Sequence, residues 1–556
     1  MLNTLKKYRA TLFDDMLAGL TGAVAGAPQA MGFAILAGVS PLYGLYAAFI
    51  TSVVSSLLSS SQLLVFAPTN ALALVAGSAI MVAPPDKQLD VLFLLSILTG
   101  IFLLLIGLFR LGNMTRFVSN AVMTGFITGA GLLIMLGQLH HLNNYDNTES
   151  SIPLVRVWDW FSHLHLSDYH TTMIGVASIV IIWGLHHTRF KSYATLFAMI
   201  VLTIFISVAG WDDVPDVREL SEIPRSLPLP FLPDVLLAPS LVSAAFAMSI
   251  LAAIQSAALM EATQEDEPET PNPSRDFMAM GVGNIVGGFF QGMPSCASLS
   301  RTAVNISAGG KTRLSNISAG LFIGLILVAA GDLIERIPLA VLAGHLVVAA
   351  ASLIKPGDIW MVWRVGGSAK YAMLVTFAAT MLLPLENSIY IGVGLSLLLY
   401  VYTSAGNLTV VQLQPNGDGH YRRTPLPEAL PHDDALVISV NGNLYFAAVR
   451  RLREVLPDPA TANNTVVILR IRDNQYFGTT GIRALGRYAE QLRDHNSRFV
   501  LSGVNPHIRG QLNRAGGVAV FGEENIFEAG DVVFASTERA MVSARQWLQR
   551  DVIAVE

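Results

Sequence analysis

The 556-residue sequence has few charged residues and a single cysteine. Only 13% of its residues are charged, about half the share that is usual in soluble domains, and 52% are hydrophobic, so an ordinary soluble enzyme is excluded. A net charge of −5 gives no basic surface for nucleic acid, and we expect no nucleic-acid partner. Cys296 stands alone, which excludes an intrachain disulfide and a cysteine-rich metal site. We therefore expect no metal and no cofactor.

Charge is scarcest in the first 400 residues, because residues 401–556 hold 32 of the charged side chains. In the first part, apolar runs long enough to cross about 30 Å of hydrocarbon recur with short interruptions. We predict about fourteen spans, several of them short, near residues 16–38, 42–60, 63–83, 89–109, 117–137, 172–187, 192–210, 235–262, 278–292, 295–308, 315–333, 337–354, 370–385 and 387–404. The sequence thus predicts an all-α polytopic membrane domain over residues 16–404.

Lys and Arg in the short loops predict the orientation of these spans. With a cytoplasmic N-terminus, the inside segments carry 13 of these cations and the outside loops carry 5. We therefore predict that both termini are cytoplasmic, and that residues 1–15 form a cytoplasmic N-terminal segment.

The end of the chain has a different composition. Residues 405–431 are rich in Pro and Gly and predict a linker. Beyond it, apolar β-branched runs predict strands at 435–440 and 465–471, and helical spacing predicts helices at 447–456, 480–495 and 534–549. Alternating strands and helices predict a small α/β domain over residues 432–556.

Two of the predicted spans, the third and the tenth, are interrupted by polar residues and proline. The first interruption is Ala67-Pro-Thr-Asn-Ala71, and the second runs from Pro294 to Asn305. These are equivalent positions if the fourteen spans form two halves of seven. Interrupted segments at corresponding positions are typical of inverted-repeat transporters that bind their substrate at the membrane midplane.

Short helices that meet at the midplane with their N-termini favour an anion, because their unpaired N–H groups carry the positive end of the helix dipole. Arg301 adds a full positive charge, and an arginine at membrane depth costs at least about 2.5–3.5 kcal/mol, which indicates a functional role by default. A structural ion pair, or a position at the membrane interface, is the alternative for Arg301. In the first span, Pro28 breaks the helix and Gln29 can both donate and accept hydrogen bonds.

These features predict an anion site between the third and tenth spans. For its Ser, Thr and Asn residues, hydrogen bonding between helices is the alternative. The predicted substrate-binding residues are Gln29, Phe33, Thr69, Asn70, Ala71, Ser298, Ser300, Arg301 and Thr302.

Taken in order, several short motifs resemble the sulfate permease (SulP) family of anion transporters, which is related to the eukaryotic sulfate and chloride/bicarbonate exchangers and to prestin. The resemblance covers nearly the whole chain. It implies two inverted repeats of seven spans, a core domain that moves against a gate domain, a homodimer, and a cytoplasmic C-terminal STAS domain. The matching pieces are Pro28-Gln-Ala-Met31, Gly44-Leu-Tyr46, Pro68-Thr69, Gly125-Phe126, Gly283-Asn284, Ser300-Arg301 and Gly309-Gly-Lys-Thr312.

The sequence differs from the family at one position. Many members carry a carboxylate in the eighth span that is associated with proton or sodium coupling, and Gln255 stands at that position here. A neutral amide has no titratable proton, so we expect no cation coupling through this residue.

In the tail, Gly478-Thr-Thr-Gly481 resembles the turn that bacterial STAS domains present for phosphorylation, although the aspartate before it is absent. Thr479 and Thr480 are therefore candidates for a regulatory site, and a helix N-cap is the alternative.

The sequence favours a secondary active transporter of inorganic anions, with a sulfate-like oxyanion as the first choice, working by alternating access in the bacterial inner membrane. Bicarbonate, chloride or dicarboxylate transport or exchange stays open, as does an uncoupled anion channel. A third possibility is that the STAS domain makes the protein chiefly a membrane anchor or sensor for a cytoplasmic regulatory partner.

Overall fold

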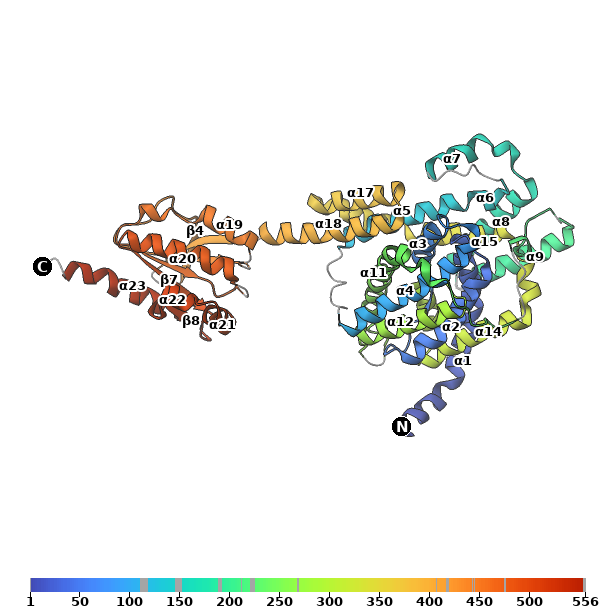
Figure 1. Cartoon of the computed structure of the whole chain (residues 1–556), viewed down its shortest axis with the longest axis horizontal. Coiled ribbons are helices and arrows are strands. Elements are labelled where there is room, and N and C mark those ends of the chain that lie inside the picture. The colour runs from blue at the N-terminus through green and yellow to red at the C-terminus, as the bar shows by residue number, and fades with distance from the viewer. Residues whose placement is uncertain are drawn as a thin grey trace. The chain divides into compact units, whose positions relative to one another are not determined.

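The structure is a computed structural model that describes residues 2–110, 119–145, 153–188, 193–211, 213–220, 226–267, 270–406, 408–416, 420–442, 444, 446–474 and 477–553. The chain forms two compact units, Met1–Leu397 and Leu398–Glu556 (Figure 1). The first unit is almost entirely helical, and the second contains a mixed sheet. Arg116, Arg189 and Lys191, three of the loop cations behind the predicted orientation, lie outside the described residues.

Every predicted span falls on a helix. Eight of the described helical segments are long and apolar enough to cross a membrane, and the others are shorter or less apolar. The fourteen helices are α1 (Leu2–Leu36), α2 (Pro41–Leu58), α3 (Asn70–Ile80), α4 (Gln88–Leu108), α5 (Asn120–Gly137), α8 (Tyr169–His186), α9 (Ala194–Ala209), α11 (Ala238–Ala262), α12 (Pro273–Phe289), α13 (Leu299–Ser307), α14 (Arg313–Glu335), α15 (Leu339–Leu353), α17 (Gly367–Leu382) and α18 (Leu385–Gly406). The connections contain α6 (Leu139–Asn143), α7 (Pro153–Ser162), α10 (Val217–Leu220) and α16 (Pro356–Val365).

The first helix differs from its prediction, because α1 begins at Leu2 and continues without a break into the first span. Most of the predicted N-terminal segment, residues 1–15, is therefore helical.

The membrane helices form two groups. Helices α1–α4 pack with α11–α14, and in Figure 1 the blue α4 lies beside the green α12. Helices α5, α8 and α9 pack with α15 and α17. Small residues allow close contacts within the first group: a Cβ on Gly44 of α2 would lie 2.0 Å from the carbonyl oxygen of Ala30 in α1. This division into two groups agrees with the expected core and gate domains.

The two interrupted spans are joined by a short sheet. Strand β1 (Phe66–Pro68) precedes α3, and strand β2 (Ser295–Ala297) precedes α13. The strands pair antiparallel, with Phe66 opposite Ala297 and Pro68 opposite Ser295. Extended backbone inside a membrane domain needs partners within the protein, and the pairing supplies them.

A buried carboxylate on α12 holds the segment that leads into β1. The fully buried Asp276 accepts hydrogen bonds from the hydroxyls of Ser59 (2.9 Å), Ser60 (2.7 Å) and Ser61 (2.5 Å), and from the Ser61 N–H (3.2 Å). These bonds fix the approach to half-helix α3.

A second carboxylate, Glu267 in the α11–α12 connection, accepts from the N–H groups of Gln62 (2.7 Å) and Leu63 (3.0 Å). Burial raises the pKa of Glu267, while these two backbone hydrogen bonds oppose the shift. The α11–α12 connection therefore also fixes the start of the third span.

The second unit contains a six-stranded sheet in the order β4-β3-β5-β6-β7-β8. Strands β5 to β8 run parallel, and β3 is antiparallel to both of its neighbours. Alternate residues face opposite sides: Ile438 packs in the larger apolar cluster, and Val437 packs with Ala540 of α23. The elements are β3 (Thr409–Pro415), β4 (Tyr421–Thr424), β5 (Ala435–Asn441), α19 (Phe446–Val455), β6 (Val466–Arg470), α20 (Thr479–Asp494), β7 (Arg498–Val504), α21 (Pro506–Arg514), α22 (Gly517–Phe521), β8 (Ile526–Glu528) and α23 (Ala535–Ile553).

The predicted α/β character of this unit is confirmed, including strands β5 and β6 and helices α19, α20 and α23. The linker predicted over residues 405–431 is wrong, because β3 and β4 lie within it and pair with each other and with β5. Pro415 ends β3, and Pro425, Pro427 and Pro431 lie in the connection from β4 to β5, so residues that are typical of connections between strands were interpreted as a linker.

Candidate functional site

The N-termini of two short helices come together at the strand pair. Helix α3 starts at Asn70 with Thr69 as its N-cap, and α13 starts at Leu299 with Ser298 as its N-cap. Neither N-cap side chain accepts from the backbone N–H groups of its own helix, although the Asn70 side chain accepts from the Ala71 N–H at 2.8 Å. The first turns of both helices therefore present backbone N–H groups and the positive ends of their dipoles.

A cavity of about 1190 Å³ lies in front of these helix ends. One wall comes from α1, α3, α11 and α13, and the other comes mainly from α5, α8 and α15. Exposed residues such as Glu261, Gln264 and Lys355 line its far end, so the cavity opens between the α11–α12 connection and the start of α16. Seven residues singled out from the sequence line it: Gln29, Phe33, Thr69, Asn70, Gln255, Ser298 and Ser300.

Hydrogen bonds join the first helix to half-helix α13 in the cavity wall. The Ser300 hydroxyl donates to Oε1 of Gln29 at 3.3 Å, and the hydroxyls of Ser298 and Ser300 lie 3.5 Å apart. The prediction that Pro28 breaks the first span is wrong, because α1 runs as one helix from Leu2 to Leu36 with Pro28 inside it. The first and tenth spans still share one polar surface through Gln29 and Ser300.

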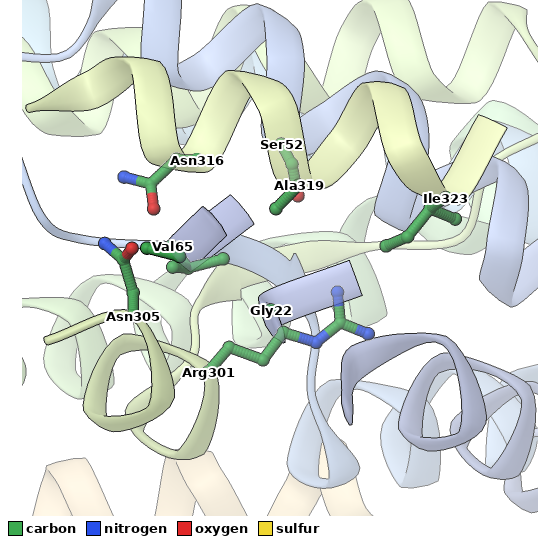
Figure 2. A pocket seen from close by; sticks show the side chains of 9 residues that line it. Gly22, Ser52, Val65, Arg301, Asn305, Asn316, Ala319 and Ile323 are labelled. Atoms are coloured by element: carbon green, nitrogen blue, oxygen red, sulfur yellow. The ribbon is translucent and has the colours of Figure 1, made fainter. Parts of the chain in front are cut away.

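Arg301 has a different position from the one predicted. Its side chain is only 4% exposed and is absent from the large cavity lining; it borders a separate void of about 10 Å³. Figure 2 shows the side chain extending from α13 towards Gly22 of α1, with Asn305 on the same helix and Asn316 on α14 also lining the void. The guanidinium donates to the carbonyl oxygen of Gly26, and among the described residues no carboxylate pairs with it.

Arg301 therefore does not line the large cavity in this conformation, and its contact with the anion stays a prediction; the alternative of a structural ion pair finds no carboxylate among the described residues. Successive side chains on a helix point about 100° apart, so Ser300 faces the cavity while Arg301 faces α1. Arg301 instead leaves an uncompensated positive charge behind the site.

Thr302 and Ala71 also lie outside the cavity lining. The fully buried Thr302 hydroxyl accepts from the N–H of Val65 at 3.1 Å, beside the 2.9 Å bond from the Ser298 N–H to the Val65 carbonyl. Thr302 therefore positions the β1–β2 crossing instead of contacting a ligand. Ala71 is 6% exposed and packs in the apolar core.

Gln255 lies in the cavity wall and takes part in the support of the site. Its Oε1 accepts from the Cys296 thiol at 3.4 Å, and the same sulfur lies 3.4 Å from the Thr69 hydroxyl. A neutral amide at position 255 thus connects α11 to the crossing of the half-helices. Cys296, which the sequence excluded only from disulfides and metal sites, is a buried supporting residue here.

Polar residues on the opposite wall were not singled out from the sequence. Thr124 and Thr128 of α5 line the cavity, but their hydroxyls donate to backbone carbonyls one turn earlier. His345 of α15 also lines it. An ionisable residue within an apolar span is a functional candidate by default, and that signal was present in the sequence for His345.

The candidate regulatory residues Thr479 and Thr480 are exposed in the first turn of α20. The N-cap is Gly478, whose φ of 32° suits glycine, and no side chain caps the helix. The threonines therefore do not act as N-caps.

The comparisons with known proteins agree with this architecture. Residues 12–378 match the sulfate permease family, and residues 427–531 match the STAS domain. Sulfate transporter 4.1, chloroplastic, from Arabidopsis thaliana is 26% identical over 92% of this chain and 78% of its own. The Bacillus subtilis protein YbaR is 25% identical over 90% of this chain and 97% of its own.

Among solved structures, murine Solute Carrier 26 family member A9 in the inward-facing state has a TM-score of 0.84 at 19% identity, covering 96% of this chain and 91% of that one. This likeness supports the fold. Because the family match covers most of the membrane unit and the STAS match covers the α/β unit, the chain is a multi-pass membrane protein of the sulfate permease family, whose members are anion transporters and not enzymes.

Proposed function

We propose that this protein is a secondary active transporter of a sulfate-like oxyanion, which binds at the N-termini of α3 and α13. The observation that carries the proposal is the meeting of these two helix ends at one cavity, with the unpaired charge of Arg301 behind them. Helix N-termini are ready-made anion sites, and the nearby positive charge favours the anion further.

The lining chemistry supports an oxyanion. Hydroxyl and amide groups of Thr69, Ser298, Ser300 and Gln29 stand around the helix ends, and each can donate a hydrogen bond to an oxygen. A tetrahedral oxyanion offers acceptors in several directions, so it can use donors that come from different helices. The name of the Arabidopsis relative supports the same substrate.

The one-sided cavity supports alternating access, with the α3–α13 group moving against the α5–α15 group. In the orientation predicted from loop cations, the cavity opens to the cytoplasm, so this conformation faces inward. We place the protein in a bacterial inner membrane, as a homodimer with cytoplasmic termini and a STAS domain that binds a regulatory partner. The Bacillus subtilis relative supports a bacterial setting.

Uptake of radiolabelled sulfate into proteoliposomes tests this function. We expect saturable uptake, with unlabelled sulfate competing better than bicarbonate, chloride or succinate. Stronger competition by one of those anions would identify that anion, instead of sulfate, as the substrate. Steady anion current without saturable uptake would instead indicate an uncoupled channel, which would overturn the transporter assignment.

Replacing Ser300 by Asp places a fixed negative charge at the N-terminus of α13. We expect sulfate uptake to fall at least tenfold, because the new carboxylate occupies the donors meant for the anion and repels it. Ser307→Asp is the matched control: Ser307 lines the cavity on the same helix, but at its C-terminal end. Equal losses in both variants, measured as initial uptake rates, would contradict the placement of the site.

A further inference from the structure

His345 is the deepest polar side chain that α15 contributes to the cavity. The residues of α15 that line the cavity are His345, Val348, Ala349, Ser352 and Leu353, which follow helical spacing and form one face. Lys355 and Asp358 continue this lining towards the open end. His345 therefore lies at the inner end of this face of α15, farthest from the cavity opening, on the wall opposite the half-helices.

The imidazole is buried, and only one of its two ring nitrogens has a hydrogen-bond partner. His345 is 5% exposed; its Nδ1 lies 2.9 Å from the Thr195 hydroxyl of α9, and its Nε2 has no hydrogen-bond partner. A buried polar atom without a partner costs about 1–3 kcal/mol, so its presence needs a reason other than stability. An apolar residue at this position would pack without that cost.

The described surroundings of His345 contain no carboxylate that would hold it protonated. Helices α5 and α9 carry no titratable side chain, and the described acids of α1, Asp14 and Asp15, pair with Lys311 or the 311–312 backbone. The titratable groups on the other helices packed against α15 are Tyr169, His170 and His186 of α8 and His140 and His141 of α6. The cavity itself has two carboxylates, Glu261 and Asp358, at its exposed open end, so an anion bound at the half-helices is the negative charge that would lie across the cavity from an imidazolium at this position.

We infer that His345 takes up a proton when the anion occupies the cavity, so that anion binding and transport depend on pH through this side chain. The inference rests on the proposed anion transport. In the tautomer whose Nδ1–H donates to Thr195, a hydronium ion of the cavity water delivers the proton: its O–H bond breaks as the N–H bond forms at Nε2, and water is left. The anion favours the imidazolium by Coulomb attraction, and linkage requires that the proton favour the anion by the same factor.

This assignment gives the protein a titratable group although Gln255 has none. The two positions lie on opposite walls of the cavity: Gln255 belongs to the helix group of α3 and α13, whereas His345 belongs to the group of α5 and α15. The proton would therefore bind on the α5–α15 wall, against which the half-helices move in the proposed transport cycle.

The test measures proton uptake directly. Sodium sulfate is added to purified protein in weakly buffered detergent solution with a pH indicator, between pH 5 and 8, where histidine titrates. We expect the wild-type protein to take up protons on sulfate binding and His345→Gln to take up none. His186→Gln is the matched control, since His186 is an exposed histidine that lines the same cavity; this variant should behave like the wild type.

Thr195→Val gives a second test, because a purely structural role of His345 would leave the pH midpoint of proton uptake unchanged in this variant. Removing the hydroxyl next to Nδ1 should shift the pH midpoint of proton uptake while keeping its amplitude. Proton uptake by His345→Gln equal to that of the wild type, or loss of uptake in His186→Gln, would overturn the inference. If the wild-type protein neither binds nor transports sulfate, the proposed function fails; sulfate transport with unchanged proton uptake in His345→Gln refutes only the role of His345.

Discussion

Arg301→Met is expected to weaken sulfate binding by roughly 30-fold or more and to reduce uptake at low sulfate accordingly. The guanidinium does not line the cavity, so its effect acts through space. Two unit charges about 8 Å apart attract by about 2 kcal/mol at an effective dielectric constant of about 20, which is about a 30-fold change in affinity. Sulfate binding by calorimetry and radiolabelled uptake both measure this loss.

Arg301→Lys separates an effect through space from direct contact. Lysine keeps the charge but loses the planar fork that binds an oxyanion with two parallel hydrogen bonds. We expect Arg301→Lys to retain most of the affinity. A loss as large as that in Arg301→Met would show that the guanidinium contacts the anion, in a conformation other than this one.

Asp276→Ala should lower the free energy of unfolding by about 3 kcal/mol. A hydrogen bond to a charged group contributes about 1.5–3 kcal/mol, and loss of this carboxylate leaves several buried donors of the 59–61 segment without an acceptor. Thermal unfolding in detergent measures the effect. Because this segment leads into β1 and α3, sulfate uptake should fall as well.

Asp266→Ala is the control for Asp276→Ala. Asp266 is an exposed acid in the neighbouring α11–α12 connection, so its removal is expected to change stability by less than about 0.5 kcal/mol. Equal stability of the two variants would mean that the bonds to Ser59, Ser60 and Ser61 contribute no net stability.

Much of the fold was readable from local features. Apolar runs predicted fourteen helices, because crossing hydrocarbon demands long apolar segments whatever their neighbours are. Pro68 and Pro294 predicted the two broken spans, since proline and clustered hydroxyl groups are unfavourable within an unbroken transmembrane helix. The linker prediction failed because Pro and Gly mark a turn between strands and a flexible connection alike.

The site was only partly readable. Gln29, Thr69, Asn70, Ser298 and Ser300, which the sequence predicts to bind the substrate, line the cavity, and their contact with the anion stays a prediction. The sequence could not predict the orientation of Arg301 and Thr302, because that orientation depends on the exact residue at which α13 begins. A shift of the helix start by one residue turns each side chain by about 100°.

The sequence by itself determined that this chain is a multi-pass membrane protein with a C-terminal α/β domain, since composition, span length and the position of the breaks are properties of the chain. Only the tertiary structure decided which side chains share the cavity. Facing residues such as Gln29 and Ser300, or His345 and Thr195, are distant in sequence and meet because helices from separate parts of the chain pack together. The same packing turns the charge of Arg301 away from the cavity.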